Sequence, residues 1–258
     1  MSDFRVYAIR YAERDAVRGE HFHGYDARAA EPHPTSYYVW LAVSDQHTVL
    51  IDTGIAPARA AGIAGLRYRT SPVNALAALD VTPDAVDHVI LTHLHYDHTG
   101  TAHQFGNAKY VVQDAELGYW TSHWPARVIR ESWLLEDEDL AHLQEAETDG
   151  RLLLATGDMT ILPGLSVHLV GGHTAGMQVV RVRTAVGTFV LASDASHFYE
   201  NIEDDRPFPI LSTMTGTYGA FDRIKQLADS PDHIVAGHDP LVLDRFPRLT
   251  PDIAVIAG

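Results

Sequence analysis

The chain of 258 residues carries 19 basic and 34 acidic residues, a formal charge of −15, and no cysteine. The absence of thiols excludes disulfide frameworks, thiolate metal sites and cysteine nucleophiles, so any metal ion must be held by nitrogen and oxygen. The acidic charge disfavours nucleic acids and anionic membranes as partners, and we expect a small-molecule substrate instead.

The N-terminal half is predicted to alternate strands with short helices. Residues 3–12 form a predicted strand whose charges exclude a signal peptide. Because no apolar run approaches about eighteen residues anywhere, we expect a cytoplasmic protein. A polar loop over 20–35 precedes strands over 36–44 and 47–54, with a turn at Asp45–Gln46 between them. Helices are then predicted over 57–66 and 71–79, and strands over 88–92 and 108–113.

The second half begins with a predicted helical insertion over about 114–150, rich in Ala, Leu and Glu. Strands return over 165–170, 177–184 and 187–194, followed by a helix over 219–229 and a last strand over 233–239. Apolar residues make up 46% of the chain, enough for a sizeable core. Strands mixed with helices without strict alternation favour a layered α/β fold, and we expect one domain spanning 1–258.

The stretch ILTHLHYDHTG, directly after a predicted buried strand, concentrates His93, His95, Asp97 and His98 in six residues. Histidines two residues apart on an extended segment can direct two imidazoles at one ion. Asp97 and His98 then point elsewhere and could serve a second ion. Four titratable groups in one loop carry a desolvation cost that metal binding would offset, so the cluster predicts a metal site.

Further ligands are available where later strands end. His173 lies in a glycine-flanked turn, Asp194 ends the strand LASD, and His238 ends the last strand. Taken alone, each of these residues is as often a structural residue as a ligand. The cluster upstream favours the metal interpretation for all three, and a carboxylate such as Asp194 can bridge two ions about 3.5–4 Å apart.

The chain resembles the metallo-β-lactamase fold hydrolases. HLHYDH matches their His-x-His-x-Asp-His signature, and VLIDTG (49–54) matches a second motif, whose aspartate, here Asp52, orients a ligand from behind. The resemblance spans about residues 37–239 and implies an αββα sandwich with the metals at one end, between the sheets. It implies a first site from His93, His95 and His173, a second from Asp97, His98 and His238, and a bridge from Asp194.

Within this fold the layout is most similar to that of the N-acyl-homoserine lactone lactonases, which share the helical insertion and the short C-terminus. Zinc β-lactamases have a cysteine where this chain has Asp194. The acidic charge argues against ribonuclease Z relatives, and the short C-terminus argues against hydroxyacylglutathione hydrolase. One departure is His197, which stands where these lactonases place a carbonyl-facing tyrosine.

The expected enzyme is a hydrolase with two divalent ions, zinc or alternatively manganese, iron or cobalt. A hydroxide between the ions would attack a lactone or ester carbonyl, and Asp97 would shuttle the proton. His197 or Tyr199 would donate a hydrogen bond to the developing oxyanion. Hydrolysis of an amide, thioester or catabolic ring compound remains an alternative, as does a non-catalytic metal-binding domain. A flavodiiron-like redox protein is disfavoured because that branch has glutamate at position 95.

Aromatic residues from the N-terminal loop and the insertion are candidates for the substrate pocket. They are Phe22, Tyr37, Trp120, Trp124 and Trp133. For any single one, packing against the core remains an alternative, and the spacing of Trp120 and Trp124 is typical of a helix face that packs on a core. A monomer or a homodimer is expected.

Overall fold

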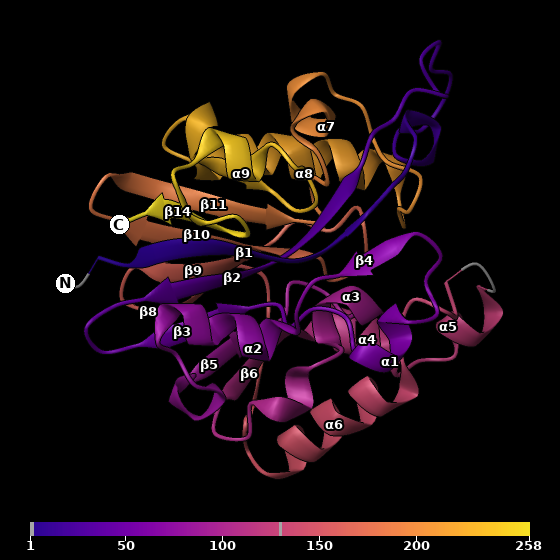
Figure 1. Cartoon of the computed structure of the whole chain (residues 1–258). Coiled ribbons are helices and arrows are strands. Elements are labelled where there is room, and N and C mark those ends of the chain that lie inside the picture. The colour runs from indigo at the N-terminus through magenta and orange to yellow at the C-terminus, as the bar shows by residue number, and fades with distance from the viewer. Residues whose placement is uncertain (1–2, 129–130) are drawn as a thin grey trace.

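The computed structural model describes residues 3–128 and 131–258, and it confirms the predicted αββα sandwich. Two β-sheets face each other, and helices cover the outer face of each sheet (Figure 1). The larger sheet has the order β13-β14-β1-β2-β3-β5-β6-β7, with β4 paired to β1, and the smaller sheet has the order β12-β11-β10-β9-β8. No helix in the described part of the chain is long and apolar enough to cross a membrane.

The strands of the larger sheet are β1 (Arg5–Arg14), β2 (Thr35–Val43), β3 (Thr48–Ile51), β4 (Leu66–Tyr68), β5 (His88–Ile90), β6 (Lys109–Gln113), β7 (Leu152–Ala155), β13 (Arg248–Thr250) and β14 (Ile253–Ala257). Those of the smaller sheet are β8 (Met159–Leu162), β9 (Leu165–Leu169), β10 (Gln178–Thr184), β11 (Gly187–Ser193) and β12 (Ile234–Ala236). The helices are α1 (Pro57–Ala60), α2 (Pro72–Leu76), α3 (Tyr96–Thr99), α4 (Asp114–Trp120), α5 (Trp124–Arg127), α6 (Asp137–Thr148), α7 (Tyr199–Glu203), α8 (Met214–Leu227) and α9 (Val242–Arg245).

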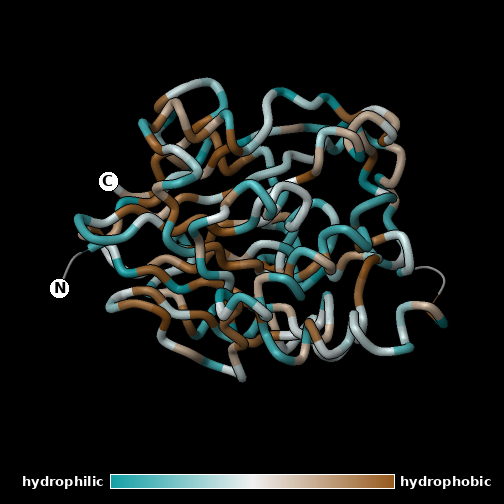
Figure 2. Tube along the Cα trace, turned by 90° about the horizontal axis from the view of Figure 1, so that it is seen from below, coloured by the Kyte–Doolittle hydropathy of each residue, from teal (hydrophilic) through white to brown (hydrophobic). Residues whose placement is uncertain are grey.

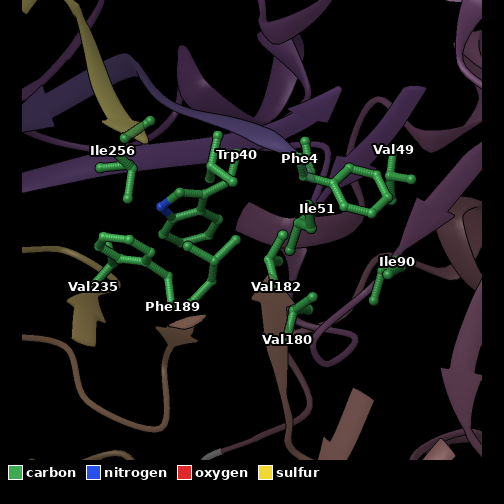
Figure 3. Close-up of a cluster of buried hydrophobic side chains, with 14 of the residues drawn as sticks. Phe4, Trp40, Val49, Ile51, Ile90, Val180, Val182, Phe189, Val235 and Ile256 are labelled. Atoms are coloured by element: carbon green, nitrogen blue, oxygen red, sulfur yellow. The ribbon is translucent and has the colours of Figure 1, made fainter. Parts of the chain in front are cut away.

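The main core lies between the two sheets. Trp40 and Ile51 of the larger sheet and Val182 and Phe189 of the smaller one are buried and belong to one contact cluster. Figure 3 shows side chains of both sheets pointing into this shared space. β-Branched and aromatic residues dominate these strands because such side chains fit a pleated surface that packs on another sheet.

Two further apolar layers attach the helices to the outer faces of the sheets. In α8, Ala220, Ile224 and Leu227 are buried at the four- and three-residue spacing of one helix face. The side chain of Thr213 caps the same helix by accepting a hydrogen bond from the backbone of Gly216. Figure 2 shows hydrophobic stretches along the interior strands and hydrophilic ones in many of the connecting loops.

The helix predicted over 57–66 is wrong in extent. Only Pro57–Ala60 is helical, and Leu66–Tyr68 forms β4, antiparallel to the end of β1. Turns follow the helix over 61–65, and Gly65 has a φ of +76°, a left-handed conformation that glycine adopts without strain. The segment therefore turns back toward the sheet and adds a short strand beside β1.

Within residues 114–150 the structure places α4, α5 and α6, with residues 129–130 outside the described residues. The sequence interpretation missed β7 and β8 after this segment, and β13 and β14 at the C-terminus. β14 pairs with β1 at the opposite end of the chain, and this pairing places the C-terminal segment in the larger sheet.

Candidate metal centre and its cavity

The candidate metal centre lies where several strands end. β3, β5 and β6 run parallel, so their carboxyl ends meet at one edge of the larger sheet. His93 and His95 follow β5, and α3 adds Asp97 and His98 one turn later. The three remaining ligand candidates come from the smaller sheet: His173 between β9 and β10, Asp194 after β11, and His238 after β12.

The structure brings all seven predicted ligands together in two adjacent groups. One group is His93, His95 and His173, and the other is Asp97, His98, Asp194 and His238; within each group the ligand atoms lie within 4.8 Å of one another. In the first group His95 Nδ1 and His173 Nε2 are 3.0 Å apart. The first group has the three residues that the resemblance implied for the first site, and the second group has the three implied for the second site together with Asp194.

Asp194 lies between the two groups with one carboxylate oxygen toward each. Its Oδ1 is 2.9 Å from His238 Nε2 and 3.3 Å from His98 Nε2. Its Oδ2 is 3.4 Å from His173 Nε2 in the other group. This arrangement fits a carboxylate that bridges two ions.

The donor atoms have the arrangement expected of metal ligands. Among the described residues, His93 Nε2, His98 Nε2 and Asp194 Oδ1 are buried without a hydrogen-bond partner. Buried polar atoms without partners are costly, and metal ions held by the two groups would satisfy all three. The residues therefore fit two divalent ions held by nitrogen and oxygen.

The opposite ring nitrogens are held by hydrogen bonds that fix the orientation of the rings. His173 Nδ1 lies 2.8 Å from the carbonyl oxygen of Ile210, and His238 Nδ1 lies 2.9 Å from that of Ser36. A carbonyl can only accept, so each Nδ1 donates its proton and leaves Nε2 with a free lone pair. That tautomer is the metal-binding one.

The electrostatics of the two groups differ. Burial lowers the pKa of His93 and His95 well below the usual range and that of His173 to about 3. These three imidazoles are therefore neutral, as metal ligands must be. Burial also opposes the charged form of His98, but the nearby carboxylates, led by Asp194, outweigh it and hold the pKa of His98 well above the usual range. An ion binding at the second group must displace that proton, so its affinity falls as pH is lowered.

Asp52 supports the second group from behind. It has a φ of 59°, in the left-handed region, and its Oδ2 lies 2.8 Å from His98 Nδ1. Its carboxylate also accepts from the backbone N–H of Thr92 at 2.7 Å and from the hydroxyl of Ser193 at 3.1 Å. Asp52 thus ties the loop after β3, the loop after β5 and the end of β11 to one metal ligand, as its motif predicted.

Asp52→Asn is expected to weaken binding of the ion at the second group by about 10- to 100-fold, the usual cost of losing such a supporting carboxylate. Asparagine tolerates the left-handed backbone, so the loop is retained while the charge behind His98 is lost. The measurement is a chelator competition titration on the metal-loaded protein, with Asp45→Asn at an exposed turn as the matched control. Equal affinity in wild type and Asp52→Asn would show that Asp52 has no influence on the ligand.

Glu116 is a structural residue of the site that the sequence interpretation missed. Its buried carboxylate accepts hydrogen bonds from Leu94 N at 3.0 Å, Trp120 Nε1 at 2.9 Å, Thr174 Oγ1 at 2.7 Å and Gly176 N at 2.8 Å. It therefore joins the loop that carries His95 to the loop that carries His173. The signal was an acidic residue four positions before Trp120 on the apolar face of α4.

A cavity of about 320 Å³ opens over the metal centre. Its floor includes His95, Asp97, His173, Asp194, His197 and His238. Of the five aromatic candidates, Tyr37 and Trp133 line this cavity, while Phe22, Trp120 and Trp124 do not. Trp120 is buried and hydrogen-bonded to Glu116, Phe22 is buried, and Trp124 is exposed. Sequence reasoning missed several wall residues, among them Arg14, Tyr96 and Ile210.

The two candidate oxyanion donors have different positions. His197 lines the cavity, its Nε2 lies 3.0 Å from Asp194 Oδ2, and its ring stacks on Phe208 with centroids 4.1 Å apart. Tyr199 is not brought to this cavity: its ring belongs to the core between the sheets, and Arg245 covers it at 3.5 Å. The start of α7 turns Tyr199 inward, so only His197 has a position compatible with a substrate contact.

Comparisons with known proteins agree with this geometry. Residues 32–238 match the model of the metallo-beta-lactamase superfamily. The N-acyl homoserine lactonase AiiA of Bacillus thuringiensis subsp. kurstaki is 28% identical over 218 residues, which cover 78% of this chain and 80% of the relative. AttM of Agrobacterium fabrum, also an N-acyl homoserine lactonase, is 28% identical over 173 residues, 65% of this chain and 64% of the relative.

Solved structures share the fold over nearly the whole length. An N-acyl homoserine lactone hydrolase with the product N-hexanoyl-L-homoserine at its metal centre superposes with a TM-score of 0.78 at 21% identity, covering 98% of this chain and 100% of the other. The dizinc quorum-quenching lactonase AidC gives 0.74 at 17% identity, covering 100% and 98%. The predicted family resemblance, including its similarity to the lactonases, is confirmed.

Proposed function

Because the chain belongs to the metallo-β-lactamase superfamily and its predicted ligands form two groups that share Asp194, we propose that it is a dinuclear hydrolase that opens a lactone or related ester. The shared carboxylate is the observation that carries the proposal, because it couples two metal positions at the floor of one cavity. The lactonase relatives favour a cyclic ester over other carbonyl substrates.

We propose Zn²⁺ as the metal, because imidazole and carboxylate donors suit it and no thiolate is available. His93, His95 and His173 would hold one ion, and Asp97, His98 and His238 the other, with Asp194 shared. Bound divalent ions would supply Lewis-acid chemistry, polarising a carbonyl and lowering the pKa of water to about 7.

Two residues of the floor are assigned roles in the reaction. Asp97 lines the cavity with its side chain 12% exposed, and we assign it the proton transfer to the leaving oxygen of the ester. His197 is held between Asp194 and Phe208, and we assign it a hydrogen bond to the substrate carbonyl as charge develops on its oxygen. Its proximity to Asp194 and its place on the cavity wall support that role.

The test is a panel of lactones, linear esters, an amide and a thioester, offered to the zinc-, manganese- and cobalt-loaded protein. We expect lactones to have the highest kcat/KM and Zn²⁺ to support turnover. Faster hydrolysis of the amide or the thioester would replace the proposal with the alternative hydrolase class. Lack of turnover of every compound by fully loaded protein would contradict a hydrolytic function.

His197→Ala is expected to lower kcat on the preferred lactone by up to about 10²–10³-fold, the cost of one lost oxyanion donor, with both ions retained. His197→Tyr is expected to shift the preference toward N-acyl-homoserine lactones, because it restores the residue that those lactonases carry. The measurement is kcat/KM for wild type and both variants across the lactone panel, beside metal analysis of each protein. Unchanged kinetics in both variants would remove His197 from the reaction.

A further inference from the structure

The cavity has two chemically different walls. One wall is apolar and includes Ile63, Trp133 and Ile210. The other wall comes from the end of β1, the following loop and the start of β2, and it is polar: Arg14, Glu20, His21, Thr35 and Tyr37. A compact substrate in this cavity therefore meets both hydrocarbon and hydrogen-bonding groups.

Arg14 is the cation of the polar wall, and its orientation is fixed. Its Nη1 donates to Glu20 Oε2 at 2.9 Å, and Glu20 Oε1 in turn accepts from the backbone N–H of Val17 at 3.1 Å. A guanidinium has five N–H donors in a planar fork, so the contacts with Glu20 and with the Tyr37 hydroxyl leave donors for a further acceptor. The Arg14 side chain is 26% exposed and lines the cavity.

Arg14 is separated from the metal centre by one aromatic ring. Burial and the charge of Asp97 raise the pKa of Tyr37, while the charge of Arg14 and its hydrogen bond with the Tyr37 hydroxyl oppose that rise. The Tyr37 ring lies edge-on to the ring of His238, with centroids 5.1 Å apart. A group bound to Arg14 would therefore lie only a few bonds from a carbonyl placed over the ions.

Arg59, the other arginine among the described residues that line the cavity, is held by contacts of its own. Its Nη2 donates to the backbone carbonyl of Trp133 at 3.2 Å, its Nε pairs with Glu136 at 3.0 Å, and its guanidinium lies over Tyr96 at 4.9 Å. These contacts attach the insertion to α1. The Arg59 guanidinium is therefore held toward the insertion, whereas that of Arg14 is held by Glu20 and Tyr37.

The charge at the floor favours an anion as the occupant. Among the described ligand candidates only Asp97 and Asp194 are carboxylates, so two bound divalent ions would leave the floor of the cavity positively charged. Glu20 offsets the charge of Arg14 but leaves the remaining guanidinium N–H groups available for a carboxylate.

We propose that Arg14 binds a carboxylate of the substrate, so that the preferred substrates are lactones or esters bearing an anionic group close to the reacting carbonyl. This inference rests on the proposed function and specifies its substrate class. It predicts discrimination by charge on the polar wall, while the apolar wall accepts the hydrocarbon part of the same molecule.

The kinetic test compares γ-butyrolactone with the same ring carrying a carboxylate on the carbon next to the ring oxygen. The wild-type protein is expected to have the higher kcat/KM on the lactone that carries the carboxylate. Arg14→Gln should lose about 10- to 100-fold in kcat/KM on it, mainly through KM, as expected for one charge-assisted contact. The neutral lactone should be unaffected, and Arg14→Lys should recover part of the loss. Arg28→Gln, an equal charge change in the exposed N-terminal loop, is the control.

A binding experiment separates failure of this inference from failure of the proposed function. Glutarate and butyrate are each titrated into the zinc-loaded protein by calorimetry. Each molecule has one carboxylate that can bind the metals, but only glutarate has a second carboxylate for Arg14. Glutarate should bind about 10-fold more weakly to Arg14→Gln, with butyrate unchanged. If no lactone is hydrolysed but this difference holds, the hydrolase proposal fails and the anion site stands. Equal losses on both lactones, or unchanged glutarate binding, would overturn the anion site.

Discussion

Asp194→Ala is expected to leave the purified protein with less than one equivalent of divalent metal per chain, against two in wild type. Asp194 is the side chain with one oxygen near His238 and His98 and the other near His173. Its removal takes a ligand from both ions and the only described bridge between them. It would also leave Asp97 as the single carboxylate among the described ligand candidates to oppose the charge of two bound ions.

The measurement is elemental analysis after reconstitution with zinc and exhaustive dialysis. Asp45→Ala, in the exposed turn between β2 and β3, is the matched control because it removes a carboxylate far from the site. Circular dichroism of both variants separates metal loss from unfolding. Two equivalents retained by folded Asp194→Ala would show that each ion is held by its own histidines and that the bridge is dispensable.

The metal centre was predictable because most of its candidate ligands lie close together in the sequence. Four ligands fall within six residues, and the others sit where short apolar strands end. A strand that ends in a loop delivers its last side chain to one edge of the sheet, so a pattern of strand ends predicts a shared site. The resemblance then assigned each ligand to an ion, and the structure brings the same seven residues together in two adjacent groups.

The residues of the cavity wall were less predictable because tertiary contacts bring them together, and no local sequence pattern indicates those contacts. Arg14 reaches the cavity from the end of β1, and Ile210 reaches it from the segment before α8. In the sequence, Glu116 resembles an ordinary surface residue of an acidic insertion. In the folded structure it is hydrogen-bonded to the loops that carry His95 and His173. Tyr199 shows the converse: it is close to Asp194 in sequence, but its backbone turns the ring into the core.

The strands of the fold likewise differ in how well the sequence predicts them. Strands with long apolar runs, such as β2 and β10, were predicted within one or two residues of their observed ends. β4 and β14 depend on pairing with β1. Without that partner, each segment is too short for its strand propensity to override the helix or loop pattern of the residues around it. Strand pairing over such sequence separations is a tertiary effect, which overrides local propensity.

Asp97→Asn is expected to reduce kcat on an alkyl lactone by about 10²–10⁴-fold, the range for a lost general acid–base group, while both ions remain bound. The amide oxygen can still act as a ligand, but an amide cannot carry a proton to the leaving oxygen. Asp97 has a suitable position, because its Oδ2 is 3.6 Å from His98 Nε2 and 3.8 Å from His238 Nε2 while its side chain remains open to the cavity.

The leaving group separates a proton-transfer role from a ligand role. An alkoxide released from a lactone needs a proton, whereas 4-nitrophenolate released from 4-nitrophenyl acetate is stable without one. The loss in Asp97→Asn should therefore be large on the lactone and small on the aryl ester, with equal metal content confirmed by elemental analysis. Equal losses on both substrates, in proportion to lost metal, would make Asp97 a ligand and nothing more. In that case, the proton would have to reach the leaving oxygen from another group at the floor of the cavity.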